Sequence, residues 1–182
     1  MLTSLLIASA LFAADAPTIS EAATDEHGFR IHRVTSEYQK GETLIRVLLP
    51  DQLETGRSLK VLYVLPVEAG TEHHYGDGLI EAKRLNLANR HQVICVAPTF
   101  SHLPWYADHP TDKAIQQESY FVRVVVPAVE KRYPALAERN GRLLVGVGLG
   151  SKATRESDEF GVFGVPYERR GDRTDEYIEA MK

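Results

Sequence analysis

Hydrophobic and polar positions alternate along two segments in the first third of the chain. Polar and apolar side chains are interspersed in residues 30–34, which read Arg-Ile-His-Arg-Val, and in residues 43–49, which read Thr-Leu-Ile-Arg-Val-Leu-Leu, and Pro50 ends the second run. A period of two is typical of strands with one covered and one open face. Residues 37–42, which include Gly41, separate the two runs. The pattern predicts an antiparallel hairpin.

Three later segments are apolar at nearly every position, namely residues 59–65, 92–97 and 142–147. Such runs indicate strands that are covered on both faces. Residues 77–89 and 115–133 lie between them and have helical character, and Pro127 should kink or restart the second helix. Alternating strands and helices predict crossover connections, a mostly parallel sheet and an α/β fold.

The functional crevice of such a sheet lies beyond the C-terminal ends of its strands. Three segments fall there by this reasoning: residues 66–76, residues 98–112 and the turn at residues 146–151. We therefore expect the site to be built from these three segments.

The N-terminus has the pattern of a secretory signal. Residues 5–13 are apolar, and Ala14-Asp15-Ala16 offers a cleavage site, although no Lys or Arg precedes the apolar stretch. The alternative is a disordered or buried N-terminal segment. We expect a signal peptide over residues 1–16, a polar linker over residues 17–29, and a secreted or periplasmic protein.

Composition narrows the classes of function. The chain has 182 residues and a formal net charge of -4, so it lacks the basic surface that nucleic acid requires. The apolar N-terminal stretch is too short for a membrane span. The single Cys95 excludes an intrachain disulfide, and its apolar neighbours indicate a small buried side chain.

Neither a cofactor nor a metal is predicted. The glycines Gly146, Gly148 and Gly150 have the spacing G-x-G-x-G, which is not the dinucleotide-binding fingerprint. Metal-ligating side chains do gather on the two predicted loops, but without an established ligand spacing. They are His73, His74, Asp77, His102, Asp108 and His109.

Several motifs occur together and in order: VLYVLP, RHQVICVAP, WYADHP, ESYFVRVVVPAVEKRYP and GRLLVGVG. Over residues 31–146 the chain resembles the esterase D-like family of the α/β-hydrolases. The resemblance implies a three-layer fold with a mostly parallel sheet and an antiparallel N-terminal hairpin. It also implies ester hydrolysis by a serine nucleophile, with an oxyanion hole formed by backbone N–H groups of Val67, Glu68 and Leu149.

The chain departs from that family at the nucleophile. Gly148 stands where the motif G-x-S-x-G carries its serine, and Ser151 is the nearest replacement. No histidine follows His109, so a serine has no downstream general base. An upstream histidine paired with Ser151 is an alternative, because triads are defined by geometry. We expect a truncated or diverged domain over residues 30–150, inactive as this chain, followed by a charged tail over residues 151–182.

The second predicted loop carries an aromatic cluster with a candidate binding role. Trp105 and Tyr106, with His102 nearby, either line a substrate pocket or cover the end of the sheet. The second functional hypothesis is therefore a non-catalytic module that binds an ester or a carbohydrate-derived ligand. Because no buried-strand pattern follows residue 147, we also expect an open sheet edge and self-association through it.

Overall fold

The computed structural model describes residues 16–146, which form a mixed α/β fold. Residues 16–144 fall in one compact unit. The strands of the described part are β1 Thr18–Ile19, β2 Ala23–Thr24, β3 Arg30–Thr35, β4 Glu42–Leu48, β5 Lys60–Val64, β6 Val93–Pro98 and β7 Arg142–Val145. The helices are α1 Gly78–Arg84, α2 Leu87–His91, α3 Gln117–Tyr120 and α4 Val126–Arg132, with a π-helical segment η1 Phe121–Val125 and a 3-10 turn η2 Arg139–Gly141.

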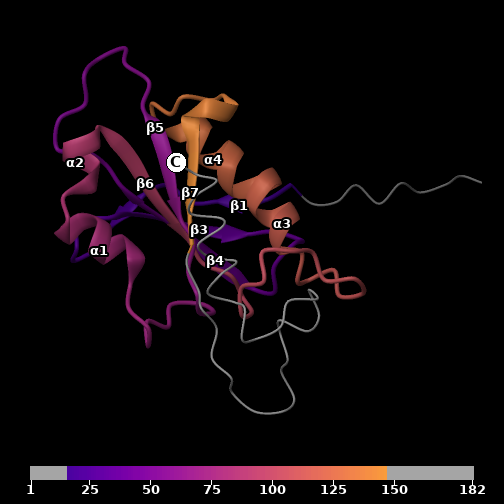
Figure 1. The fold of residues 1–182 in the computed structure, drawn as a ribbon. Helices are drawn as coiled ribbons and strands as arrows, with labels where there is room; N and C mark the ends of the chain where they lie inside the picture. Colours follow the sequence, from indigo (N-terminus) through magenta and orange to yellow (C-terminus); the bar gives the residue numbers. More distant parts are fainter. Residues whose placement is uncertain (1–15, 147–182) are drawn as a thin grey trace, which may run out of the picture. The chain divides into compact units, whose positions relative to one another are not determined.

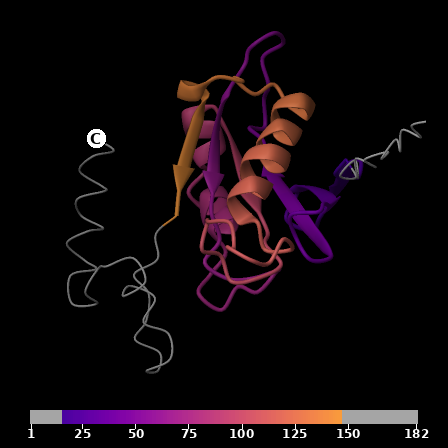
Figure 2. The same cartoon turned by 90° about the vertical axis from the view of Figure 1, so that its right-hand side faces the viewer.

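The sheet joins an antiparallel part to a parallel part. Its order is β1-β3-β4-β6-β5-β7, and β2 pairs with β3 beside β1. Strands β3 and β4 form the predicted hairpin, with Val34 opposite Thr43, and β4 pairs with β6 in the antiparallel sense. Strands β5 and β6 are parallel, and the arrow of β7 runs in the same direction as that of β5 (Figure 2). The expected fold class is confirmed.

Helices cover both faces of the sheet, which gives three layers (Figure 1). Strand β6 is apolar throughout because both of its faces are covered. Ile94 and Val96 belong to the hydrophobic cluster that includes α3 and α4, whereas Cys95 and Ala97 belong to the cluster that includes α1 and α2. Cys95 is fully buried, as predicted, and burial raises the pKa of its thiol to about 11.

The helix predicted around Pro127 is interrupted, and the proline explains how. Pro127 has no N–H to donate to the carbonyl four residues earlier. The chain forms η1 just before it, where the N–H of Val126 bonds to the carbonyl of Phe121, and then restarts as α4 with Pro127 in its first turn. The π-helical turn thus ends just before the proline, where the regular hydrogen-bond pattern is interrupted.

Two segments differ from the sequence-based expectation. Residues 17–29, expected as a linker, contain β1 and β2, and the side chain of Phe29 is fully buried. Strands of two residues are too short to show a period. Residues 77–89, expected as one helix, form α1 and the start of α2, with Asn86 in a left-handed conformation between them (φ 55°).

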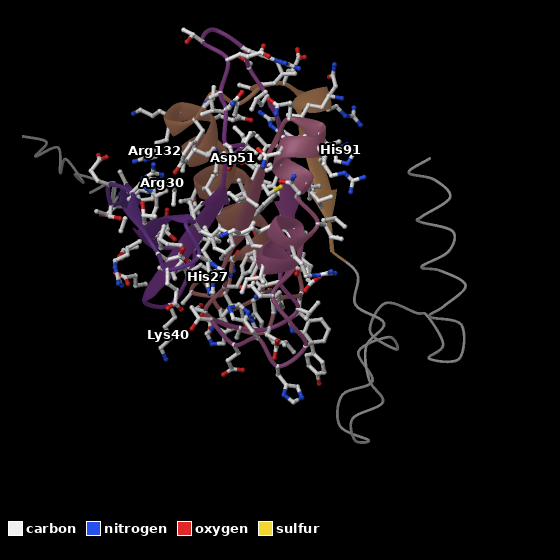
Figure 3. All side chains as sticks on the ribbon, turned by 90° about the vertical axis from the view of Figure 1, so that its left-hand side faces the viewer. His27, Arg30, Lys40, Asp51, His91 and Arg132 are labelled. Atoms are coloured by element: carbon white, nitrogen blue, oxygen red, sulfur yellow. The ribbon has the colours of Figure 1, made fainter. Side chains whose placement is uncertain are left out.

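The side chains of Lys40 and Arg132 lie on the outside of the described residues (Figure 3). Within residues 16–146, no helix has both the length and the apolar composition that crossing a membrane would require.

Candidate functional site

A small cleft lies where β5 and β6 end, at the place expected for the functional crevice of a parallel sheet. Its solvent-accessible volume is about 30 Å³, enough for one or two water molecules. The chain segments around it are the end of β5, the loop that follows β5, the start of α1 and the end of β6. Its polar lining includes Arg46, Glu68, His73, Asp77 and Thr99.

A buried ion pair forms one wall of this cleft. Nη2 of Arg46, on β4, lies 2.6 Å from Oδ2 of Asp77, and the two side chains are only 9% and 6% exposed. The guanidinium of Arg46 also lies 5.3 Å from the centre of the Phe29 ring. Truncating one partner of such a pair leaves the other charge buried and unpaired, so the site requires both residues.

Asp77 has two further contacts that fix its carboxylate. Its Oδ1 accepts the N–H groups of Leu79 and Ile80 at 2.9 and 3.4 Å, which caps α1. Burial alone would raise the pKa of Asp77, but the hydrogen bond and charge of Arg46, the Leu79 N–H and the nearby His73 together hold that pKa below its ordinary value. Asp77 is therefore ionised at neutral pH.

His73 approaches the same carboxylate from the loop after β5. Its Nε2 lies 3.4 Å from Oδ2 of Asp77, and its side chain is 39% exposed, so the imidazole contacts both the buried anion and solvent. A tight turn directs the loop back towards α1: the N–H of Gly76, whose φ is 97°, donates to the carbonyl of His73 at 3.0 Å. At Gly78 a Cβ would lie 2.5 Å from Cγ1 of Val64, so glycine permits the close approach of α1 to β5.

Glu68 holds this loop from the inside. Its side chain is buried, and its two carboxylate oxygens accept the N–H groups of His74 and Tyr75, each at 3.0 Å. Within residues 16–146, the N–H groups of Val67 and Glu68 donate to no backbone carbonyl. The two expected oxyanion donors thus line the cleft with their N–H groups outside the backbone hydrogen-bond network.

The loop after β6 is held by a different residue. Gln117, buried at the start of α3, accepts the N–H groups of Trp105 and Tyr106 at 2.7 and 3.0 Å and donates to the carbonyl of Leu103 at 3.0 Å. Asp108 accepts the N–H and the hydroxyl of Ser119 at 2.9 and 2.6 Å. One buried amide therefore fixes the aromatic part of the loop.

The structure separates the aromatic residues from the cleft. Trp105 and Tyr106 are more than one-third exposed, and His102 contacts the Ser101 hydroxyl at 3.1 Å. None of the three is among the cleft-lining residues of the described chain. The Tyr106 hydroxyl nevertheless donates to the carbonyl of Pro66, which joins the two loops.

The remaining predicted site residues, Gly148, Leu149 and Ser151, lie outside the described residues. Within the described part, no group of three or more His, Cys, Asp or Glu side chains is arranged to hold a metal ion.

Sequence reasoning missed Arg46 and the side-chain roles of Glu68 and Gln117, and it named Asp77 only among metal-ligating side chains. Arg46 and Asp77 are 31 residues apart, and no local pattern reports such a contact. The only local signal was the pair Asp77-Gly78 before a helical segment, which is a helix-capping pattern.

Comparison with solved structures supports the fold. An S-formylglutathione hydrolase from Agrobacterium tumefaciens superposes with a TM-score of 0.50 at 16% sequence identity, over 69% of this chain. The match covers 51% of the hydrolase, so this chain spans about half of its length. No protein-family model matches the sequence, and no curated protein matches it. At this identity the likeness extends to the fold alone, which resembles part of the fold of that hydrolase.

Proposed function

We propose that this chain is an esterase-type α/β-hydrolase domain that binds carboxylic esters with the carbonyl group in the small cleft at the ends of β5 and β6, and the rest of the ester outside it. The observation that carries the proposal is the cleft itself, where the N–H groups of Val67 and Glu68 lie outside the backbone hydrogen-bond network. Two N–H groups at such a position are suited to an ester carbonyl oxygen. The fold likeness to a solved hydrolase supports the same conclusion.

The proposal is tested by binding of an ester analogue that cannot turn over readily. The amide p-nitroacetanilide has the shape of p-nitrophenyl acetate and keeps its carbonyl oxygen. We expect saturable binding in a calorimetric titration, weakened by Val67→Pro, which removes an N–H donor, and retained by Val67→Ala, which keeps it. Circular dichroism verifies that both variants fold. Absence of saturable binding to the folded wild-type chain contradicts the proposal.

We propose further that this chain does not use a serine nucleophile. Gly148 occupies the elbow position, and no histidine follows His109. A fluorophosphonate probe should therefore leave the folded protein unlabelled. Labelling of Ser151 that disappears in Ser151→Ala would overturn this part of the proposal and make Ser151 the nucleophile.

A second candidate function is carbohydrate binding by the loop after β6. The half-exposed rings of Trp105 and Tyr106 favour it, because exposed aromatic faces can pack against sugar rings. Saturable binding of maltotriose that is lost in Trp105→Ala would support this function. The ester-binding function predicts that Trp105→Ala leaves p-nitroacetanilide binding intact.

Two further proposals concern the whole chain. Export is tested by N-terminal sequencing of protein from the periplasm or the medium, which should begin at Pro17. Self-association is suggested by β7, the last strand of the described sheet, where Leu143, Leu144 and Val145 are each 40–50% exposed. Sedimentation should show a concentration-dependent dimer that Leu144→Lys converts to monomer; a wild-type monomer at high concentration contradicts self-association.

A further inference from the structure

His73 and His74 are neighbours in sequence but have different surroundings. His73 and the ionised Asp77 both line the cleft, and the imidazole of His73 contacts the carboxylate. The imidazole of His74 instead packs edge-on against the ring of Tyr75, with 4.8 Å between the ring centroids. We propose that His73 is a general base that activates water for ester hydrolysis, with Asp77 as its positioning residue. This inference rests on the proposed ester-binding function of the same cleft.

Asp77 determines which nitrogen of His73 is free to accept a proton. A carboxylate without protons can only accept hydrogen bonds, so the nitrogen that faces it, Nε2, carries the hydrogen. In that tautomer the lone pair is on Nδ1, at the other side of the ring. The 3.4 Å separation is long for a hydrogen bond, as is common for catalytic contacts in an unliganded site.

The charges around His73 allow the imidazolium that forms during the reaction. Asp77 faces the ring from the start of α1, and Glu68 and Glu72 lie in its own loop. Arg46 is the only cation among the other charged residues that line the described cleft, and its hydrogen bond is made to Asp77. The residues that β5 and β6 contribute to the lining, including Val64 and Ala97, are uncharged.

The proposed reaction needs only water as co-reactant. Nδ1 of His73 takes a proton from water while the water oxygen bonds to the ester carbonyl carbon. The π electrons of the carbonyl move to its oxygen, which the N–H groups of Val67 and Glu68 stabilise. When the intermediate collapses, the bond to the alcohol oxygen breaks and the imidazolium returns its proton to that oxygen. The products are a carboxylic acid and an alcohol, and His73 is neutral again. No serine takes part, in agreement with Gly148.

The first experiment compares the two histidines in the full chain with p-nitrophenyl acetate as substrate. General-base catalysis contributes on the order of 100-fold or more to rate, so His73→Gln should lower kcat/KM by about that factor. His74→Gln should stay within about twofold of wild type, because its side chain packs against the Tyr75 ring and is not part of the lining of the described cleft. Equal losses in both variants, or no loss in His73→Gln, overturn the inference.

The outcome also separates this inference from the proposed function. If p-nitroacetanilide binds but the wild-type chain does not hydrolyse p-nitrophenyl acetate above the buffer rate, His73 is not a general base and the ester-binding function stands. If the analogue does not bind, the proposed function fails as well.

The role of Asp77 is tested by readouts that a purely structural role would not change. Asp77→Asn should lower kcat with little change in KM, because an amide can also donate and no longer fixes the hydrogen on Nε2 of His73. A changed KM with an unchanged kcat contradicts the positioning role. If that variant does not fold, the ¹⁵N chemical shifts of the wild-type imidazoles decide: His73 should be protonated at Nε2 and unprotonated at Nδ1 when neutral, and the opposite tautomer overturns the inference.

Discussion

The loops that follow β5 and β6 lie at the same end of the sheet but are held in different ways. In the loop after β5, the buried groups are charged: Glu68 accepts two N–H groups, and Asp77 pairs with Arg46. In the loop after β6, the buried group is the neutral amide of Gln117. Aromatic side chains alone therefore do not indicate where the candidate functional site lies. The loop after β5 contains the cleft and its half-exposed histidine. In the loop after β6, the neutral amide of Gln117 holds Trp105 and Tyr106, and Asp108 binds Ser119.

The largest expected effect comes from breaking the buried ion pair of the first loop. Arg46→Met leaves the Asp77 carboxylate buried without its cation and should lower the free energy of unfolding by about 3–5 kcal/mol. The matched control is Arg84→Met, which breaks a solvent-exposed pair with Glu81 and should leave the free energy of unfolding nearly unchanged. Urea unfolding measures both, and equal costs would show that the first loop does not depend on its charged pair.

The second largest effect on stability is expected from removing the Gln117 side-chain amide, which holds the loop after β6. Gln117→Leu leaves the N–H groups of Trp105 and Tyr106 without their acceptor and should cost about 2–4 kcal/mol, since each unsatisfied group costs about 1–3 kcal/mol where it is buried. Glu118→Gln, at the exposed neighbouring position, is the control and should leave the urea midpoint unchanged. A mild effect of Gln117→Leu would mean that the loop after β6 is held by other contacts.

A smaller effect is expected from Glu68→Gln. The amide keeps one acceptor oxygen but replaces the other by a donor that faces an N–H group, so we expect a cost of about 1–3 kcal/mol in the free energy of unfolding. Hydrogen exchange should locate the loss at the amides of His74 and Tyr75. Glu72→Gln changes an exposed carboxylate of the same loop and should alter neither measurement. Faster exchange throughout the loop in both variants would argue against a specific role for Glu68.

The pH dependence of stability sharpens the contrast between the loops. The pKa of Asp77 is lowered in the folded state, so its contribution is fully present above its unfolded pKa of about 3.9 and is lost as pH falls through the folded value. The stability difference between wild type and Asp77→Asn should therefore shrink below about pH 4. The deficit of Gln117→Leu should not follow this titration. A wild-type to Asp77→Asn difference that stays constant from pH 7 to pH 2 contradicts the assignment.

The sequence predicted the elements whose signal is local and repeated. The strands β3 and β4, the covered strands β5 and β6, and the restart of the helix at Pro127 agree with the structure. Strand β7 forms where its apolar run predicted a strand, but the prediction that it is covered on both faces was wrong, because Leu143, Leu144 and Val145 are 40–50% exposed. The short strands β1 and β2 were missed, because a period cannot be detected in two residues.

The candidate site was harder to predict, because long-range contacts determine it. Alternation in β4 predicted an open face, yet Arg46 on that strand is buried by Phe29 and Asp77, which come from distant segments. Gln117 looked like an ordinary polar position of a helix, and only the path of the loop before it gives it buried partners. The position of the cleft at the strand ends, by contrast, followed from topology alone.

We propose that the loop after β5, and not the aromatic loop, binds and acts on the ester carbonyl. The most direct test is to titrate p-nitroacetanilide into ¹⁵N-labelled protein and map the saturable amide shifts. We expect the largest amide chemical-shift changes at Val67, Glu68 and His73. Largest shifts at His102 and Trp105, or no saturable shift in the folded protein, would contradict this proposal.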